Sequence, residues 1–155
     1  MPARTSIQLV DAHASDAGLL GTMPPRQLDG LSRYLAARTR GARYEIGVKN
    51  YIQAAALIVH DARPVIIFEG VDKRPIASLA TVRAAARRGD LRYVMLGGTC
   101  GRARSVRYKH CSPAVRWIRA HSVEVRGVAG IKEPGLLFKV RPRGLMRSQH
   151  GSRPR

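Results

Sequence analysis

The sequence has few acidic residues, few aromatic residues, only two cysteines and no long apolar run, and each shortage excludes a class of protein. The longest apolar run, residues 54–59, is far shorter than the roughly 20 residues that a membrane-spanning helix needs. The first twenty residues have no apolar core behind a basic start, so we expect no signal peptide. Taken alone, the chain is therefore expected to be soluble and cytoplasmic.

Motifs for nucleotide and metal binding are missing as well. Gly97 and Gly98 follow an apolar segment, but about thirteen residues separate them from the next helix, and neither G-x-G-x-x-G nor a Walker pattern is present. Glu69 and Asp72 could act as an acid–base pair, but no third carboxylate lies near them, and loop solvation or helix capping explains them more simply. We therefore expect no cofactor, no metal and no catalytic residue.

The two cysteines, Cys100 and Cys111, flank a short basic loop. A disulfide between them, our first interpretation, would stabilise the fold by about 2–3 kcal/mol and requires an oxidising compartment. Two free thiols are the next alternative. A zinc site that includes His110 lacks a fourth ligand, and a catalytic thiol beside His110 lacks an oxyanion or orienting motif.

Acidic residues are so scarce that the net charge is +18, with 28 basic residues against 10 acidic ones. Residues 99–155 contain 14 of the basic and only 2 of the acidic residues. Charge of this size suggests a polyanionic partner, although the excess of arginine over lysine is also what GC-rich codon usage produces. The densest basic patch comprises Arg102, Arg104, Arg107 and Lys109. These side chains would suit the phosphates of a nucleic acid or of lipid headgroups. The alternative is that they belong to a solvated loop without a partner.

What the sequence does contain is a pattern that occurs three times. Apolar strands at 43–48, 64–69 and 91–96 are each followed by an amphipathic helix, at 50–60, 78–88 and 112–121. Alternating strands and helices predict an α/β fold, a three-layer sandwich with a mostly parallel sheet of about five strands. Segments 122–125 and 135–140 supply the last two strands, and the short connection 127–134 allows an antiparallel pair. The helix at 50–60 is apolar nearly all round, so we expect it to be well covered.

Domain boundaries follow from the same pattern. Residues 1–25 show no period and are expected to be irregular. Residues 26–140 form a single α/β domain, which begins with a helix whose apolar face includes Leu28, Leu31 and Leu35. Residues 141–155 are basic without apolar periodicity, which indicates a disordered tail.

The carboxyl ends of the predicted strands are where a ligand would bind. In parallel sheets these ends meet at one edge, and ligands usually bind there. The pattern brings Lys49 with Asn50, residues 69–72 and residues 97–100 to this edge. The ligand candidates among them are Asn50, Glu69, Gly70, Asp72, Gly97 and Gly98.

Residues 31–121 resemble a known family. The matching pieces, in order, are residues 31–35 (LSRYL), 41–44 (GARY), Asn50 with the alanine-rich helix after it, 63–65 (RPV) leading to Gly70, 89–98 (GDLRYVMLGG), and 115–117 (VRW) with His121. Together they resemble the C-terminal domain of bacterial membrane mannosyltransferases, which are related to dolichyl-phosphate-mannose protein mannosyltransferases and to the aminoarabinose transferase.

The resemblance implies an accessory role. In that family the catalytic aspartates and the polyprenyl-phosphate sugar site belong to a preceding membrane-spanning part, so no catalytic residue carries over. The implied function is a detached or truncated C-terminal domain of a lipid-linked-sugar glycosyltransferase on the extracytoplasmic face of the cytoplasmic membrane. Its partners would be the membrane-embedded core or an anionic lipid or glycan acceptor, and this placement favours the disulfide.

Two departures from the family pattern concern the loops. The stretch 69–75 (EGVDKRP) is shorter and more charged than the usual glycine-rich one, and Ser122 stands where a cysteine is common. The alternative function is a small basic protein that binds nucleic acid through residues 102–109. An α/β enzyme that uses the strand-end edge ranks lowest.

Overall fold

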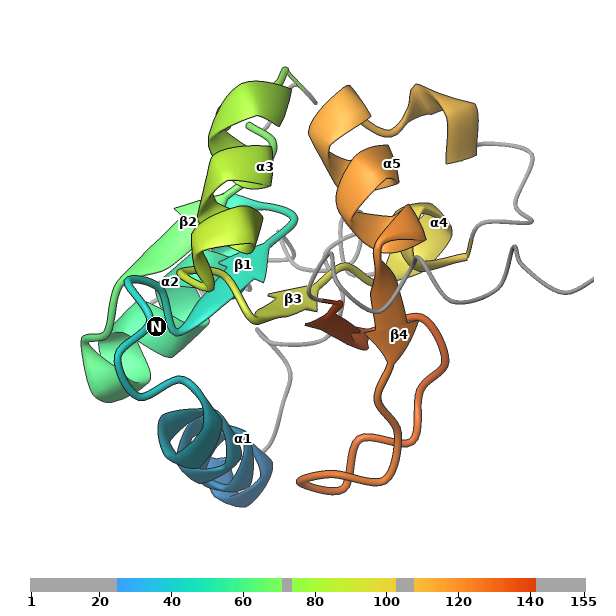
Figure 1. Cartoon of the computed structure of the whole chain (residues 1–155). Helices are drawn as coiled ribbons and strands as arrows, with labels where there is room; N and C mark the ends of the chain where they lie inside the picture. Colours follow the sequence, from blue (N-terminus) through green and yellow to red (C-terminus); the bar gives the residue numbers. More distant parts are fainter. Residues whose placement is uncertain (1–24, 71–73, 103–107, 142–155) are drawn as a thin grey trace, which may run out of the picture.

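The computed structural model describes residues 25–70, 74–102 and 108–141 (Figure 1). Helices and strands alternate along the chain as the sequence predicts. Their order is α1 (Pro25–Arg38), β1 (Ile46–Val48), α2 (Tyr51–Asp61), β2 (Val65–Ile67), α3 (Leu79–Arg88), β3 (Tyr93–Met95), α4 (Gly98–Gly101), a 3-10 helix (Tyr108–His110), α5 (Pro113–Ala120), β4 (Ser122–Glu124) and β5 (Leu137–Val140).

The helices that cover the sheet begin at polar capping residues. Asn50, Ser78 and Ser112 precede α2, α3 and α5, and each side-chain oxygen accepts a hydrogen bond from a backbone N–H of the first turn. Pro113 occupies the first turn of α5, where its missing N–H costs nothing. Gly89 ends α3 in the left-handed conformation that glycine adopts without strain. These local signals explain why the predicted helices form where they do.

Within the described residues the strands form one mixed sheet with the order β2-β1-β3-β5-β4. Strand β1 pairs in parallel with β2 and β3, whereas β5 is antiparallel to both β3 and β4. The α/β class and the antiparallel C-terminal pair are thus confirmed. The sheet is less parallel than predicted because β5 inserts between β3 and β4, so two of the strand pairs are antiparallel.

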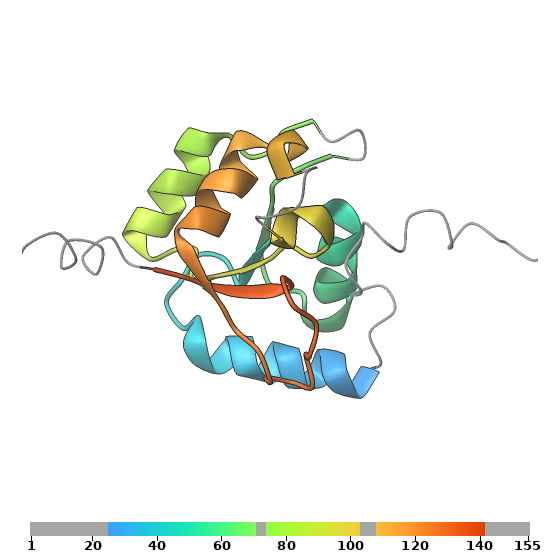
Figure 2. The same ribbon diagram turned by 90° about the vertical axis from the view of Figure 1, so that its right-hand side faces the viewer.

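Helices lie on both faces of the sheet (Figures 1 and 2). Helices α3 and α5 pack on one face, where Val82 and Ile118 join sheet residues such as Phe68 and Phe138 in one buried cluster. Helices α1 and α2 contribute to a second cluster, which contains Leu31. Because each sheet face is buried against helices, the strands are apolar on both sides, as in other α/β proteins.

Two expectations need comment. The predicted N-terminal segment and tail lie, apart from Pro25 and Arg141, outside the described residues. The prediction that α2 is well covered is wrong for its outer side, because Tyr51 and Ile58 are each 45% exposed and Val59 is 87% exposed. The helix is apolar all round, but the sheet and α1 contact only one side of it.

Candidate functional site

The carboxyl ends of β1, β2 and β3 lie side by side, as the sequence predicts. Beyond the ends of these strands, the backbone N–H of Glu69 donates to the carbonyl of Lys49 at 2.9 Å, and the N–H of Lys49 donates to the carbonyl of Met95 at 3.1 Å. The loops that follow the three strands therefore start from one edge of the sheet. This edge is the candidate site.

Asn50 has a structural task at this edge. Its Oδ1 accepts hydrogen bonds from the backbone N–H groups of Ile52 and Gln53, at 3.1 and 3.2 Å. Gln53, which the sequence reasoning did not select, is fully buried and bridges two strand ends. Its Oε1 accepts from the N–H of Lys49 at 2.8 Å, and its Nε2 donates to the carbonyl of Leu96 at 3.0 Å. A single polar residue inside an apolar helix was the signal that could have identified it.

Glu69 is also held by the fold. Its side chain is buried, and its Oε1 accepts a hydrogen bond of 2.8 Å from the backbone N–H of Ser112 at the start of α5. Gly70 donates its N–H to the carbonyl of Arg74, which closes the turn after β2. Asp72 lies outside the described residues, so the predicted pair of Glu69 and Asp72 has no described geometry.

Lys49 lies at this edge, as the strand pattern predicts, although it is not among the ligand candidates chosen from the sequence. It is only 6% exposed, and its ammonium group makes no hydrogen bond or ion pair with any residue that the structure describes. The signal in the sequence was a single lysine directly after the apolar β1, a position that turns out to be interior.

Gly97, Gly98 and the cysteines lie next to the end of β3. Gly97 and Gly98 have φ angles of 76° and 55°, which favour glycine, and the chain turns there into the short helix α4. Cys100 in α4 forms a disulfide with Cys111, with their Cα atoms 5.9 Å apart, as predicted. Gly101 packs so tightly that a Cβ atom on it would lie 1.8 Å from the carbonyl oxygen of Gly135.

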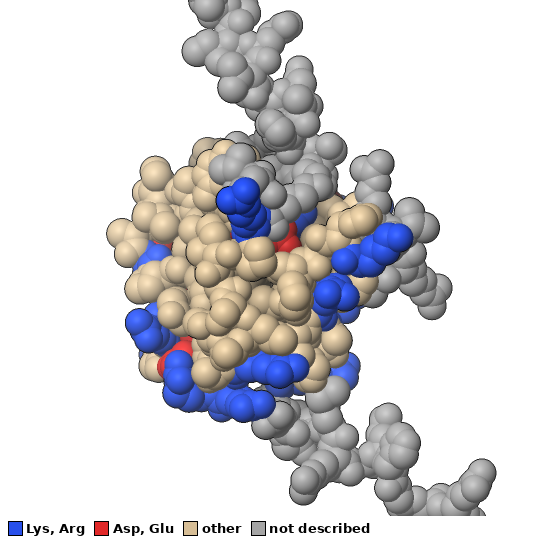
Figure 3. Space-filling view, turned by 90° about the horizontal axis from the view of Figure 1, so that it is seen from above, with Lys and Arg blue, Asp and Glu red and all other residues tan. Residues whose placement is uncertain are grey.

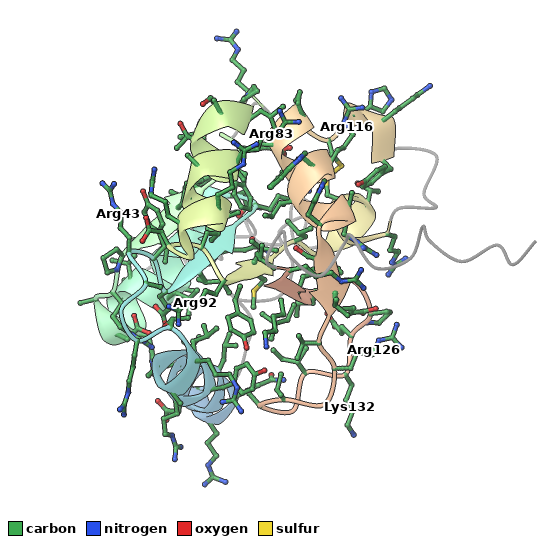
Figure 4. All side chains as sticks on the ribbon, viewed as in Figure 1. Arg43, Arg83, Arg92, Arg116, Arg126 and Lys132 are labelled. Atoms are coloured by element: carbon green, nitrogen blue, oxygen red, sulfur yellow. A yellow bond between two sulfur atoms is a disulfide. The ribbon has the colours of Figure 1, made fainter. Side chains whose placement is uncertain are left out.

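The predicted basic loop is only partly described. Arg102 and Lys109 are exposed, whereas Arg104 and Arg107 lie outside the described residues. Elsewhere the positive charge is spread out: basic side chains surround a mostly uncharged centre on the face over α3 and α5 (Figure 3), and those labelled in Figure 4 come from different elements and different sides. On the part of this face that the described residues form, Figure 3 shows no single basic groove.

A second polar cluster lies at the opposite, amino-terminal edge of the sheet. The Nη2 of Arg63 contacts Oε1 of Glu45 at 2.5 Å, and Ser32 donates to Asp61 at 2.8 Å. Burial, helped by the Asp61 carboxylate and opposed by Arg63, raises the pKa of Glu45 to about 8. Burial also acts to raise the pKa of Asp61, but hydrogen bonds from Glu45, Arg63 and Ser32 hold that pKa below its usual value.

Two further searches of the described residues were negative. No three His, Cys, Asp or Glu side chains in 25–70, 74–102 and 108–141 gather as they would around a metal ion. No helix in the same ranges has the length and apolar character to cross a membrane.

Comparison with known proteins gives one match. Comparisons with curated proteins and with solved structures returned none. A family model described as "Putative mannosyltransferase YkcB-like, C-terminal" matches residues 31–121, which run from α1 to the end of α5 and cover more than half of the chain. The chain therefore belongs to the YkcB-like mannosyltransferase C-terminal family.

Proposed function

We propose that this chain acts as the accessory C-terminal domain of a lipid-linked-sugar membrane glycosyltransferase. It helps to bind the acceptor or covers the active site of the membrane core, and it is not catalytic by itself. Family membership supports the proposal, because the matching model describes the C-terminal part of a mannosyltransferase.

The observation that carries the proposal is the uncovered apolar side of α2. Tyr51, Ile58 and Val59 are spaced by seven and eight residues, so they lie on one side of the helix, and all three are exposed. From Tyr51 to Val59 the helix has no charged residue. Full burial of one such side chain is worth about 1.5–3 kcal/mol, which favours a partner on this side.

The partner we assign to this surface is the membrane-embedded part of the same transferase. An exposed apolar stripe without charge suits a protein interface, where the buried centre is depleted of charged residues. The disulfide between Cys100 and Cys111 supports a position on the outer side of the cytoplasmic membrane, because disulfides persist in oxidising compartments.

The test changes the outer side of α2 within the complete transferase. Membranes that contain the transferase with this domain, as wild type or with I58E/V59E, are assayed for transfer of radiolabelled mannose from a lipid-linked donor. We expect the double variant to lose transfer several-fold, because two carboxylates on the contact surface would have to be buried without partners.

The matched control is V123E, since Val123 is 43% exposed on β4, the edge strand farthest from β2. V123E should keep wild-type transfer, and circular dichroism should show that all the variants fold. Full transfer by I58E/V59E would contradict the proposal.

A further inference from the structure

Lys49 is a largely buried lysine whose ammonium group has no carboxylate partner among the described residues. Ninety-four per cent of the residue is shielded from solvent, since 6% is exposed. A lysine can bury its hydrocarbon stem along apolar surface while its ammonium group stays in contact with water. Among the described residues, only Oε2 of Glu45 is a fully buried side-chain polar atom without a partner, so Nζ of Lys49 keeps some contact with solvent, and no described carboxylate lies within salt-bridge distance of it.

The alternation of side chains along β1 shows on which face of the sheet Lys49 lies. Its N–H and carbonyl continue the ladders of β1 with β3 and β2, so it alternates regularly with Val48 and shares a face with Gly47. A Cβ atom on Gly47 would contact Phe68 and Leu91, which belong to the cluster under α3 and α5. Lys49 thus adds a positive charge to the carboxyl-terminal end of this otherwise apolar layer.

The nearest acid along the ladder does not neutralise it. Glu69 is bonded through its backbone to Lys49, but its carboxylate accepts from the N–H of Ser112 and forms no ion pair with the lysine. Gln53 accepts a hydrogen bond from the backbone N–H of Lys49 but makes none with its ammonium group. The side chains of Glu69 and Gln53 thus hydrogen bond to backbone groups, whereas the ammonium group of Lys49 has no hydrogen-bond partner among the described residues.

The position of Lys49 in the topology matches a ligand site. The chain leaves β1 through α2 to β2 on one side, and then crosses to β3 on the other side of β1. The carboxyl ends of β1 and β3 therefore form the topological switch point of the sheet, where α/β proteins bind ligands. Gly97 and Gly98 follow β3 there, and without side chains they let a ligand approach the backbone.

We propose that Lys49 is the cation of an anion-binding site at this switch point, and that the site takes a phosphate group. Lysine binds phosphate as a point charge, and a phosphate supplies acceptors to all three ammonium hydrogens. The phosphate belongs either to a small soluble molecule or to a lipid headgroup. The inference does not depend on the docking of α2, because Lys49 and the outer side of α2 are separate features.

The first experiment uses inorganic phosphate as the probe. The melting temperature and the amide NMR shifts of the complete chain are followed during titration at constant ionic strength, for wild type and for K49M. We expect wild type to gain stability with phosphate, with shifts centred on residues 49–53 and 97–98, because a ligand that binds only the folded state stabilises it. K49M should bind phosphate at least tenfold more weakly.

Control variants distinguish a phosphate-binding role of Lys49 from a role in packing alone. K139M, which removes an exposed lysine from β5, should keep the wild-type response. Without phosphate, K49M should melt close to the wild-type temperature, because methionine keeps most of the buried stem and no ion pair with a described residue is lost. A wild type that does not respond to phosphate, a K49M that responds like wild type, or an equal response to acetate would each overturn the assignment.

A second arm identifies the source of the phosphate. Sedimentation with phosphatidylcholine vesicles that contain phosphatidic acid is compared for wild type, K49M and K139M. Binding that K49M alone loses assigns the site to a lipid headgroup. A response to inorganic phosphate without Lys49-dependent vesicle binding assigns it to a soluble phosphate.

Discussion

Glu45 is the residue whose environment departs most from that of its free side chain. It lies at the start of β1, its side chain is fully buried, and Arg63 and Asp61 are its charged neighbours. Its pKa rises from 4.5 to about 8 mainly because burial disfavours the charged form. Between pH 4.5 and about 8, Glu45 is therefore mostly protonated in the folded protein and mostly ionised in the unfolded chain.

This difference predicts a loss of stability as pH rises. Between pH 4.5 and about 8 the folded state binds more protons than the unfolded state, so the free energy of unfolding falls, by at most about 1.4 kcal/mol per pH unit. Urea denaturation across this range measures the slope. E45Q, which mimics the protonated side chain, should remove the contribution of Glu45.

The comparison with E45Q is needed because the measured slope sums the contributions of Glu45 and of all other ionisable groups that the two proteins share. The contributions of these shared groups are common to both proteins and cancel in the difference. Parallel curves for wild type and E45Q would show that Glu45 is charged in the folded state, contrary to this prediction.

At the scale of elements, the disulfide links α4 to the segment that leads into α5. Cys100 lies in α4 and Cys111 lies just before Ser112, the capping residue of α5, and both cysteines are buried in the cluster under α3 and α5. The bond closes a loop in the chain, and this cross-link lowers the conformational entropy of the unfolded state more than that of the folded state. Its contribution to stability therefore adds to that of the packed helices.

We expect C100A/C111A to unfold with a free energy about 2–3 kcal/mol lower than that of the oxidised wild type, as the chain-entropy model gives for a loop of this length. Urea denaturation without reductant measures the difference. The oxidised protein should also contain no thiol that reacts after unfolding. Two reactive thiols in exported material would contradict an outer-face location.

Helix α2 shows how an element can be predicted while its environment is not. Asn50 and the apolar run after it predict where the helix begins, and the structure confirms this. The same run suggested burial on all sides, but Val59 is the most exposed of the large apolar side chains in the described residues. Composition does not distinguish a helix surrounded by its own fold from one with a side left for a partner.

The whole molecule carries a net charge of +18, which keeps nucleic acid open as an alternative partner. Arg102 and Lys109 are exposed, and neither forms an ion pair within the described part of the chain. Binding through them would be mainly electrostatic, because phosphate contacts release counterions from the nucleic acid.

This alternative predicts that retention on double-stranded DNA falls steeply with salt. R102A/K109A should reduce the slope of log K against log salt by about 2, whereas exchanging as many basic residues on another face, as in R126A/K132A, should change it less. Filter binding at several salt concentrations measures both slopes. Binding that is absent at low salt, or unchanged at high salt, would rule the alternative out.

The sequence determined the elements and their order, because capping residues, glycines and apolar periods act over a few neighbouring positions. It also determined that the ends of β1, β2 and β3 meet, since parallel strands joined by helices must place them at one edge. The proximity of the two cysteines in sequence likewise made their disulfide predictable.

Only the tertiary structure decided what depends on residues far apart in the chain. The insertion of β5 between β3 and β4 follows from pairings such as Met95 with Leu137, which no local pattern specifies. Lys49 becomes largely buried only when the layers assemble, and Glu69 then bonds Ser112 at the start of α5, more than 40 residues later in the chain. Burial is a property of the assembled layers, and for that reason the charged groups at this edge acquired their environments only in the fold.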